Sequence, residues 1–339
     1  MNRLIPINKI IQEISYSTGR SLKSPEFCSL IITNKCNFKC KMCSFWQKEN
    51  SDELSVDDWR KIVNQLKTVL SKNTFIEISG GEPLLRKELV FDLIKELKKN
   101  FNKVALNTNG LLINEETVKE LNDAGLDVLK LSLYSLNSTV HNELRGHEAA
   151  FEHAKKAIKI INQNGLELEI ALLLTSKNIK QAQGLISYLQ KLPKTSIIIQ
   201  PLDEKVESSK SKDLAVNSIQ SELWPESDDV NIFFDWLNKN SLSIKNSPAN
   251  LKVIREYYLN PETVLKYRCF AGQRNLVIYP DGNVSFCFKR TPVGNLIKEN
   301  LKEILSRAKL ERLKIKKCSK YCRIVGCNFS RGFKEYIKK

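Results

Sequence analysis

The chain has no long apolar segment. None of its 339 residues lie in an uncharged apolar run of about 18, so no membrane-spanning helix is expected. Residues 1–24 carry basic side chains but no apolar core of the signal-peptide kind, and we expect a short helical or extended lead-in there. With no export signal expected, the sequence favours a reducing, cytoplasmic location, where thiols bind metals rather than form disulfides.

A basic recognition stripe is also missing. The net charge is +16, from 54 Lys and Arg against 38 Asp and Glu, yet no arginine-rich segment with interleaved aromatics occurs. Lysines scattered along helical segments indicate a solvated surface more than a nucleic-acid site. The basic stretch 314–334 is denser, so an acidic partner or RNA stays an alternative. Internal repeats are absent, apart from an alternation of strands and helices.

Cysteines are plentiful by contrast. Three of the nine, Cys36, Cys40 and Cys43, form a C-x3-C-x2-C pattern directly after the apolar run 27–32. Three thiolates can hold an iron–sulfur cluster and leave one iron free to bind a small molecule. Structural zinc sites usually use two closely spaced cysteine pairs, so zinc is the weaker alternative. Cys28 stands apart within the apolar run, and we expect a small buried hydrophobe there.

Apolar β-branched runs alternate with helical segments through the first two thirds of the chain. This spacing predicts parallel β-α-β units with right-handed crossovers, and six such units indicate an open partial barrel of the α/β class. The expected strands are Phe27–Thr33, Phe75–Ser79, Lys103–Asn107, Val128–Leu133, Leu168–Leu174 and Ser196–Gln200. Helix N-caps are expected at Ser55 and Asn114, each followed by acidic residues.

A Gly-Gly-Glu-Pro turn, Gly80, Gly81, Glu82 and Pro83, follows the second expected strand. Two glycines let the backbone pass close to a ligand, while the glutamate and free carbonyls offer acceptors to a cation. By itself this is a weak signal, since any strand-end turn can use glycine. Its position one strand after the cysteine loop gives it weight.

The cysteine loop and the Gly-Gly-Glu-Pro turn together resemble the radical S-adenosylmethionine (radical SAM) superfamily. The resemblance implies a (βα)6 partial TIM barrel, a [4Fe–4S] cluster on Cys36, Cys40 and Cys43, and S-adenosylmethionine on the open iron. It implies that the turn grips the methionyl amino group. Further cofactor contacts implied by later motifs are Asn109, Ser132, Arg145 and Leu172. The family's H-x-x-x-R-G stretch also contains His141, which can equally be a surface helix residue.

The remaining five cysteines follow a second pattern. Cys269 precedes Gly282, and four residues separate Gly282 from Cys287. A predicted hairpin of Asn275–Tyr279 and Asn283–Phe288 fixes the position of Cys287. Gly294-Asn295 then opens a predicted helical stretch, Leu301–Leu313, which leads to the last three cysteines, Cys318, Cys322 and Cys327. The pattern resembles a SPASM/twitch extension and implies a second [4Fe–4S] cluster with one thiol to spare. Cys269 and Cys287 are the firmest ligands by this resemblance, the choice among the last three stays open, and zinc is the alternative.

These features predict four regions: a lead-in (1–24), a radical SAM core (25–202), a linker with a helical insertion (203–264) and a small cysteine-rich α+β module (265–339). The implied activity is reductive cleavage of S-adenosylmethionine to a 5′-deoxyadenosyl radical that takes hydrogen from a peptide or small metabolite. A flavodoxin or ferredoxin is the implied electron donor. The lead-in is too short for a leader-binding domain, so a peptide would need a separate recognition partner or none. An iron–sulfur RNA-binding or RNA-modifying protein, and a molybdopterin-type GTP cyclase, are the alternatives; the cyclase has different C-terminal cysteine spacing.

Overall fold

The computed structural model describes residues 7–47, 52–202, 222–240 and 244–322. Six parallel strands form the larger part of its central sheet. The sheet has nine strands in the order β6-β5-β4-β3-β2-β1-β7-β8-β9. Pairing from β1 through β6 is parallel throughout, which confirms the predicted β-α-β alternation. The six strands are β1 (Phe27–Ile31), β2 (Phe75–Ser79), β3 (Val104–Thr108), β4 (Val128–Ser132), β5 (Glu167–Leu174) and β6 (Thr195–Pro201).

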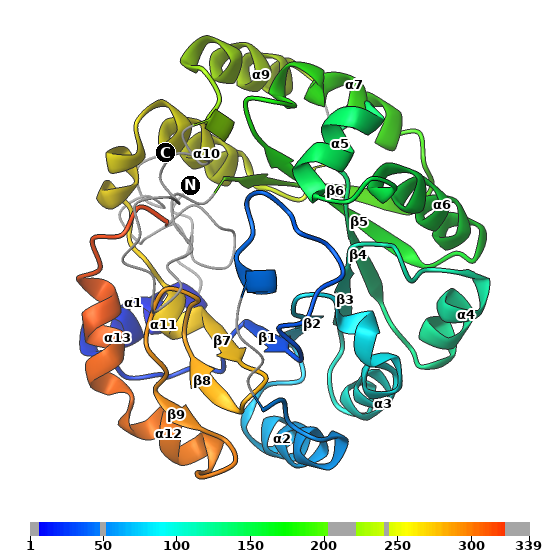
Figure 1. Cartoon of the computed structure of the whole chain (residues 1–339). Helices are drawn as coiled ribbons and strands as arrows, with labels where there is room; N and C mark the ends of the chain where they lie inside the picture. Colours follow the sequence, from blue (N-terminus) through cyan, green and yellow to red (C-terminus); the bar gives the residue numbers. More distant parts are fainter. Residues whose placement is uncertain (1–6, 48–51, 203–221, 241–243, 323–339) are drawn as a thin grey trace.

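Helices surround this arc of strands on its outer side, and the blue loop that follows β1 lies over the middle of the ring in Figure 1. The crossover helices are α2 (Val56–Val69), α3 (Lys87–Lys98), α4 (Glu115–Asp123), α6 (Ala150–Gln163) and α7 (Ala182–Leu189). An additional helix, α5 (Ser138–Arg145), separates β4 from α6. Short 3-10 turns occur at η1 (Phe45–Gln47), η2 (Pro83–Arg86) and η3 (Ile179–Gln181).

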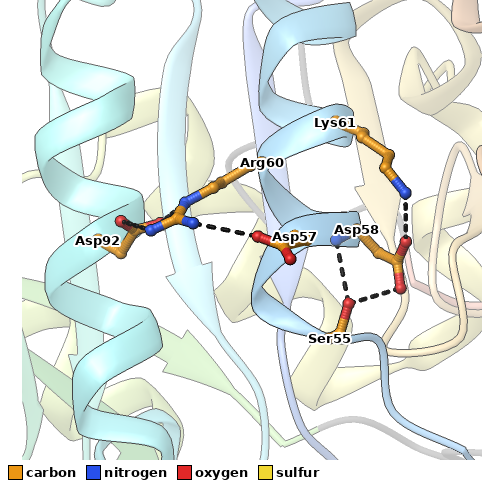
Figure 2. A network of polar contacts seen from close by, with 6 residues as sticks. All are labelled: Ser55, Asp57, Asp58, Arg60, Lys61 and Asp92. Carbon is orange, nitrogen blue, oxygen red and sulfur yellow. Dashed lines mark hydrogen bonds and ion pairs between the residues drawn. The ribbon is translucent and has the colours of Figure 1, made fainter.

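Helix α2 shows how local signals fix one crossover (Figure 2). The Ser55 hydroxyl accepts a hydrogen bond from the Asp58 amide at 3.2 Å, which confirms the predicted N-cap. Arg60 reaches across to Asp92 on α3 through two hydrogen bonds of 2.8 and 2.9 Å. Such exposed pairs contribute roughly 0–1 kcal/mol, so burial of the apolar face of α2, which includes Trp59, holds the helix to the barrel.

The cysteine-rich C-terminal region continues the same sheet. Its first strand, β7 (Asn275–Ile278), pairs parallel with β1, and β8 (Asn283–Ser285) and β9 (Gly294–Asn295) follow antiparallel. The helix predicted from Leu301 begins at that residue, where Asn300 caps it, and Gly294-Asn295 before it forms this last strand. The helices here are α11 (Ala271–Arg274), α12 (Leu301–Arg307) and α13 (Lys309–Lys316).

The lead-in is helical and packs against the C-terminal region. Helix α1 (Ile7–Thr18) places Tyr16 with its ring centroid 4.8 Å from that of Phe270, and its Glu13 pairs with Arg268 at 2.6 Å.

The helical insertion lies between β6 and the C-terminal strands. It contains α9 (Ser227–Lys239), which begins just after Pro225, then α10 (Pro248–Leu259) and η4 (Pro261–Lys266). The Tyr258 hydroxyl of α10 donates to the Leu174 carbonyl and accepts from the Leu202 amide, both at 2.7 Å, so the insertion is tied to β5 and to the residue after β6. Within the described residues, no helix combines the length and apolar character needed to cross a bilayer.

Candidate functional site

A cavity of about 240 Å³ lies beside the cysteine loop, among the strand ends of the barrel. Cys36, Cys40 and Cys43 all line it. Burial raises the pKa of Cys36, and it raises that of Cys40 to about 11, while the nearby Arg145 guanidinium opposes both shifts. The Trp46 indole donates to the Cys40 carbonyl at 3.2 Å and fixes the end of the loop. Three thiols from one short loop therefore share one wall.

The two glycines of the Gly-Gly-Glu-Pro turn pack closely against the backbone at the start of the cysteine loop. The Gly81 amide donates to the Thr33 carbonyl at 2.9 Å. A Cβ on Gly81 would lie 2.2 Å from the Lys35 carbonyl oxygen, and one on Gly80 would lie 2.5 Å from that of Thr33. Real Cβ atoms do not approach so closely. The close backbone approach foreseen from the sequence is thus to the loop itself, although both glycines also line the cavity.

A third glycine clamps the same loop from α5. Gly146 ends that helix in the left-handed conformation, with φ +61°. A Cβ there would lie 2.0 Å from the Lys39 carbonyl oxygen, while the Lys41 amide donates to the Leu144 carbonyl at 3.1 Å. The cysteine loop is therefore held between the turn after β2 and the end of α5.

Glu82 turns away from the cavity. Its buried carboxylate accepts from the Leu84 amide at 3.0 Å, the Thr108 hydroxyl at 2.9 Å and the Asn109 amide at 2.7 Å. Burial raises its pKa, against the effect of these three donors. Pro83 is likewise buried, at the start of η2. The Glu82 side chain thus braces the ends of β2 and β3.

Of the four cofactor contacts implied by the later motifs, Asn109, Ser132 and Arg145 line the cavity and Leu172 does not. Asn109 and Ser132 face it, and the Asn109 amide group donates to the Asn37 side chain at 2.6 Å. Leu172 is fully buried in the hydrophobic core instead. Because side chains alternate along a strand, its neighbour Ala171 faces the cavity in its place.

Arg145 is a buried cation beside the cysteines. It lies over the Phe38 and Tyr134 rings, 5.3 Å from each centroid, and donates to the Tyr134 hydroxyl at 3.1 Å. Its Nε has no hydrogen-bond partner among the described residues. Burial disfavours the charge, but the Tyr134 hydroxyl and the thiols of Cys40 and Cys36 outweigh it and raise the pKa of Arg145. The guanidinium is ready to receive an anion.

His141 supports this arrangement from α5. Its Nδ1 accepts from the Tyr134 amide at 3.1 Å, and the ring is only 1% exposed, so the surface-helix interpretation of this residue is wrong. Burial, with a smaller effect of Arg145, lowers its pKa to about 3. His141 is a neutral structural acceptor.

Three charged residues in the barrel interior were not predicted from the sequence. Glu77 of β2, Lys130 of β4 and Glu169 of β5 all line the cavity. The Lys130 ammonium lies 2.5 Å from Glu77 and 3.2 Å from Glu169. Burial opposes its charge, but the two carboxylates prevail and raise the pKa of Lys130. Charged residues inside otherwise apolar strands were the available signal.

Three thiols of the second cysteine set, those of Cys287, Cys318 and Cys322, lie near one another beyond the end of β8. Cys287 follows that strand, and burial raises its pKa to about 11, with Cys322 and Cys318 near enough to add to the shift. Cys269 is buried just before α11, and Cys327 lies outside the described residues. Among the described residues, no three His, Cys, Asp or Glu side chains converge as ligands of a single metal ion.

Sequence comparisons agree with this geometry. Residues 30–189 match the model of the radical SAM superfamily, and residues 269–328 match SPASM, an iron–sulfur cluster-binding domain. A protein named "Probable GTP 3',8-cyclase" from Methanococcus maripaludis is 32% identical over 222 residues, covering 62% of this chain and 70% of that protein. The subtilosin biosynthesis protein AlbA of Bacillus subtilis is 24% identical over 94% of this chain and 68% of its own length. A protein of the same name from Sulfurisphaera tokodaii is matched over 53% of its length, so the chain spans about half of that relative.

Solved structures share the fold. Streptococcus suis SuiB bound to its precursor peptide SuiA has a TM-score of 0.68 at 18% identity, over 88% of this chain and 69% of that one. The enzyme anSMEcpe with bound AdoMet has a TM-score of 0.63 at 20% identity, over 86% and 83%.

A partial α/β barrel with a three-cysteine loop over its strand ends defines an iron–sulfur enzyme of the S-adenosylmethionine-dependent class. The chain belongs to the radical SAM superfamily and carries a SPASM domain. The cofactors of this family are a [4Fe–4S] cluster with S-adenosylmethionine, and SPASM domains bind auxiliary iron–sulfur clusters. The cavity fits the [4Fe–4S] cluster with S-adenosylmethionine, because it is lined by the free thiols of the cysteine loop and by the buried Arg145 guanidinium, whose Nε donor is unpaired among the described residues.

Proposed function

We propose that Cys36, Cys40 and Cys43 hold the [4Fe–4S] cluster, and that Arg145 receives the carboxylate of S-adenosylmethionine. The unpaired Arg145 Nε within a cavity lined by all three cysteines is the observation that carries this proposal. When bound and reduced by one electron, the cofactor supplies a 5′-deoxyadenosyl radical that takes hydrogen from the substrate. Backbone carbonyls of the Gly80–Gly81 turn are placed to accept from the methionyl ammonium, with Asn109 and Ser132 as further polar contacts.

The second cysteine set is proposed to hold one auxiliary cluster. Cys287 supplies a ligand with Cys269, and two of Cys318, Cys322 and Cys327 complete the set. The mutual influence of the Cys287, Cys318 and Cys322 thiols supports this grouping. Burial of Cys269 would keep this cluster partly from solvent, and low exposure is one of the factors that set cluster potential.

A peptide is the proposed substrate, with a small metabolite as the other possibility within the same chemistry. Support comes from AlbA, a bacteriocin biosynthesis protein whose similarity extends over 94% of this chain. The function is thus hydrogen abstraction from a peptide by a radical SAM oxidoreductase. A low-potential donor such as flavodoxin or ferredoxin would deliver the electron.

A GTP cyclase activity is the second candidate, favoured by 32% identity to the Methanococcus maripaludis protein. The triphosphate of GTP would share the cavity with the carboxylates of Glu77 and Glu169. These carboxylates repel anions, which counts against GTP as the substrate. Anaerobic incubation with GTP, S-adenosylmethionine and dithionite tests it, and consumption of GTP would replace the peptide proposal.

Formation of 5′-deoxyadenosine tests the cluster assignment. Wild-type protein incubated anaerobically with S-adenosylmethionine and dithionite should release it, and the Cys36→Ala/Cys40→Ala/Cys43→Ala variant should not. Cys28→Ala is the matched control, because this buried thiol of β1 lies outside the loop and outside the cavity lining. Undiminished cleavage by the triple variant would contradict the assignment.

A further inference from the structure

The barrel interior presents a charge that its own residues do not balance. Glu77 and Glu169 share the single ammonium of Lys130, at 2.5 and 3.2 Å. Lys130 Nζ also lies 5.0 Å from the Phe75 ring centroid, so the cation on β4 is held by two groups from β2 and one from β5. We call Glu77, Lys130 and Glu169 the interior triad. Two carboxylates against one ammonium leave a net charge of −1 on it.

Nothing else in the described part of the chain neutralises that charge. Lys130 is the one Lys, Arg or His side chain found within 4.0 Å of either carboxylate. Arg145, the other buried cation on the cavity wall, is bonded to Tyr134 and influenced by the cysteines. Glu169 is 7% exposed, and a buried uncompensated carboxylate is costly until a cation reaches it. The cavity is therefore suited to a positively charged guest.

The triad lies deeper in the barrel than the cofactor contacts. Glu77 precedes Gly80 by three residues on β2, roughly 10 Å along an extended strand, and Lys130 precedes Ser132 by two residues on β4, roughly 7 Å. A group bound at the triad thus shares the cavity with the cysteine loop but lies further from it along the strands. This is the place for a part of the substrate rather than for the methionyl end of the cofactor.

We propose that the interior triad is a substrate subsite that binds an organic cation, an alkylammonium or guanidinium group. The inference rests on the proposed function, because a substrate must share this cavity with S-adenosylmethionine. Glu77 and Glu169 accept hydrogen bonds from the substrate cation, while Lys130 holds the two carboxylates at a fixed separation. The same chemistry is offered by a lysine or arginine side chain of a peptide and by a free polyamine-like metabolite.

Equilibrium dialysis of the anaerobic full chain, with its clusters and S-adenosylmethionine bound, tests the subsite. The probes are N-acetyl-lysine methylamide for the peptide source and 1,5-diaminopentane for the metabolite source. N-acetyl-norleucine methylamide is the neutral isostere, and mass spectrometry quantifies each. We expect the cationic probes to be retained at least tenfold more than the isostere, and the tighter of the two to identify the source.

Glu169→Gln and Glu77→Gln should each weaken retention of the cationic probes by tenfold or more. Glu167→Gln is the matched control, because Glu167 lies on the same strand β5 and pairs with Lys103 at 3.6 Å outside the cavity lining. It should bind the probes like the wild type. Two independent carboxamide variants keep the test decisive should one of them fail to fold.

Equal retention of cationic and neutral probes, or unchanged retention in both variants, would overturn the subsite. Loss of S-adenosylmethionine from the variants with the amine still bound would also overturn it, since the triad would then offset the sulfonium charge of the cofactor. That result leaves the proposed function standing. Absence of 5′-deoxyadenosine formation by the wild type would instead defeat the proposed function, while the dialysis would still report on the amine.

Discussion

Replacing Glu82 by alanine should loosen the turn that carries Gly80 and Gly81. The carboxylate accepts from the Leu84 and Asn109 amides and from the Thr108 hydroxyl, all in a site with no exposed surface. Each buried bond of this kind contributes about 1–1.5 kcal/mol, and the sum is about 3–4 kcal/mol. Since 1.4 kcal/mol is a factor of ten, local opening of this turn should become ~10²-fold more frequent.

Hydrogen exchange of the Leu84 and Asn109 amides measures this directly on the cluster-containing protein. Both amides should exchange ~10²-fold faster in Glu82→Ala than in the wild type, under conditions where exchange follows local opening. Glu88→Ala, which removes an exposed carboxylate in the first turn of α3, should leave both rates unchanged. Affinity for S-adenosylmethionine should fall as a secondary effect of the loosened turn.

The outcome separates two roles for this carboxylate. A side chain that gripped the cofactor directly would lose cofactor affinity on mutation with little change in exchange at Leu84 and Asn109. Exchange rates within threefold of the wild type would refute the bracing role described for Glu82.

Three further outcomes are expected. Gly146→Ala should lower iron loading, because its Cβ would lie 2.0 Å from the Lys39 carbonyl oxygen, whereas Gly184→Ala, with no atom within 4 Å, should leave loading intact and stabilise the fold by up to ~1 kcal/mol. The depressed pKa of His141, about 3 against 6.5 when unfolded, means that the unfolded chain takes up the proton first as pH falls below 6.5. Stability should therefore decrease by about 2 kcal/mol from pH 7 to pH 5, and His141→Asn should lose this dependence in denaturation curves; equal slopes would contradict it. Cys287→Ala should lose about four irons per chain by metal analysis, the content of one [4Fe–4S] unit, and bound zinc in the wild type would contradict the auxiliary cluster.

The elements foreseen from the sequence are those governed by local signals. The strand ending at Ser79 and the helix beginning at Val56 have the bounds that apolar runs and the Ser55 N-cap predict. The three-cysteine loop likewise lies where its position after an apolar strand places it, at the carboxyl end of β1. A short run of residues is enough to fix each of these features.

Features that depend on distant partners were missed or misassigned. The parallel pairing of β7 with β1 joins residues about 250 positions apart, and no local pattern announces it. Leu172 and Ala171 differ only in which face of β5 they occupy, and that phase depends on the closure of the barrel. The interior triad arises because Lys130 and Glu77, on strands that β3 separates, face each other across a curved sheet, and no local pattern shows that pairing.

Continuity of the sheet also fixes the two cysteine sets relative to each other. The loop of Cys36–Cys43 leaves β1, while Cys287 follows β8, and only β7 separates those two strands. Two contacts cross this junction: the Leu54 amide donates to the Pro280 carbonyl at 2.8 Å, and the Phe45 and Phe288 ring centroids lie 6.5 Å apart. Because both sets are attached to one hydrogen-bonded sheet, a movement of one relative to the other must break backbone pairing or these contacts. The distance between two bound clusters would therefore be set by the protein fold, and it would stay nearly constant while substrate enters and leaves the cavity.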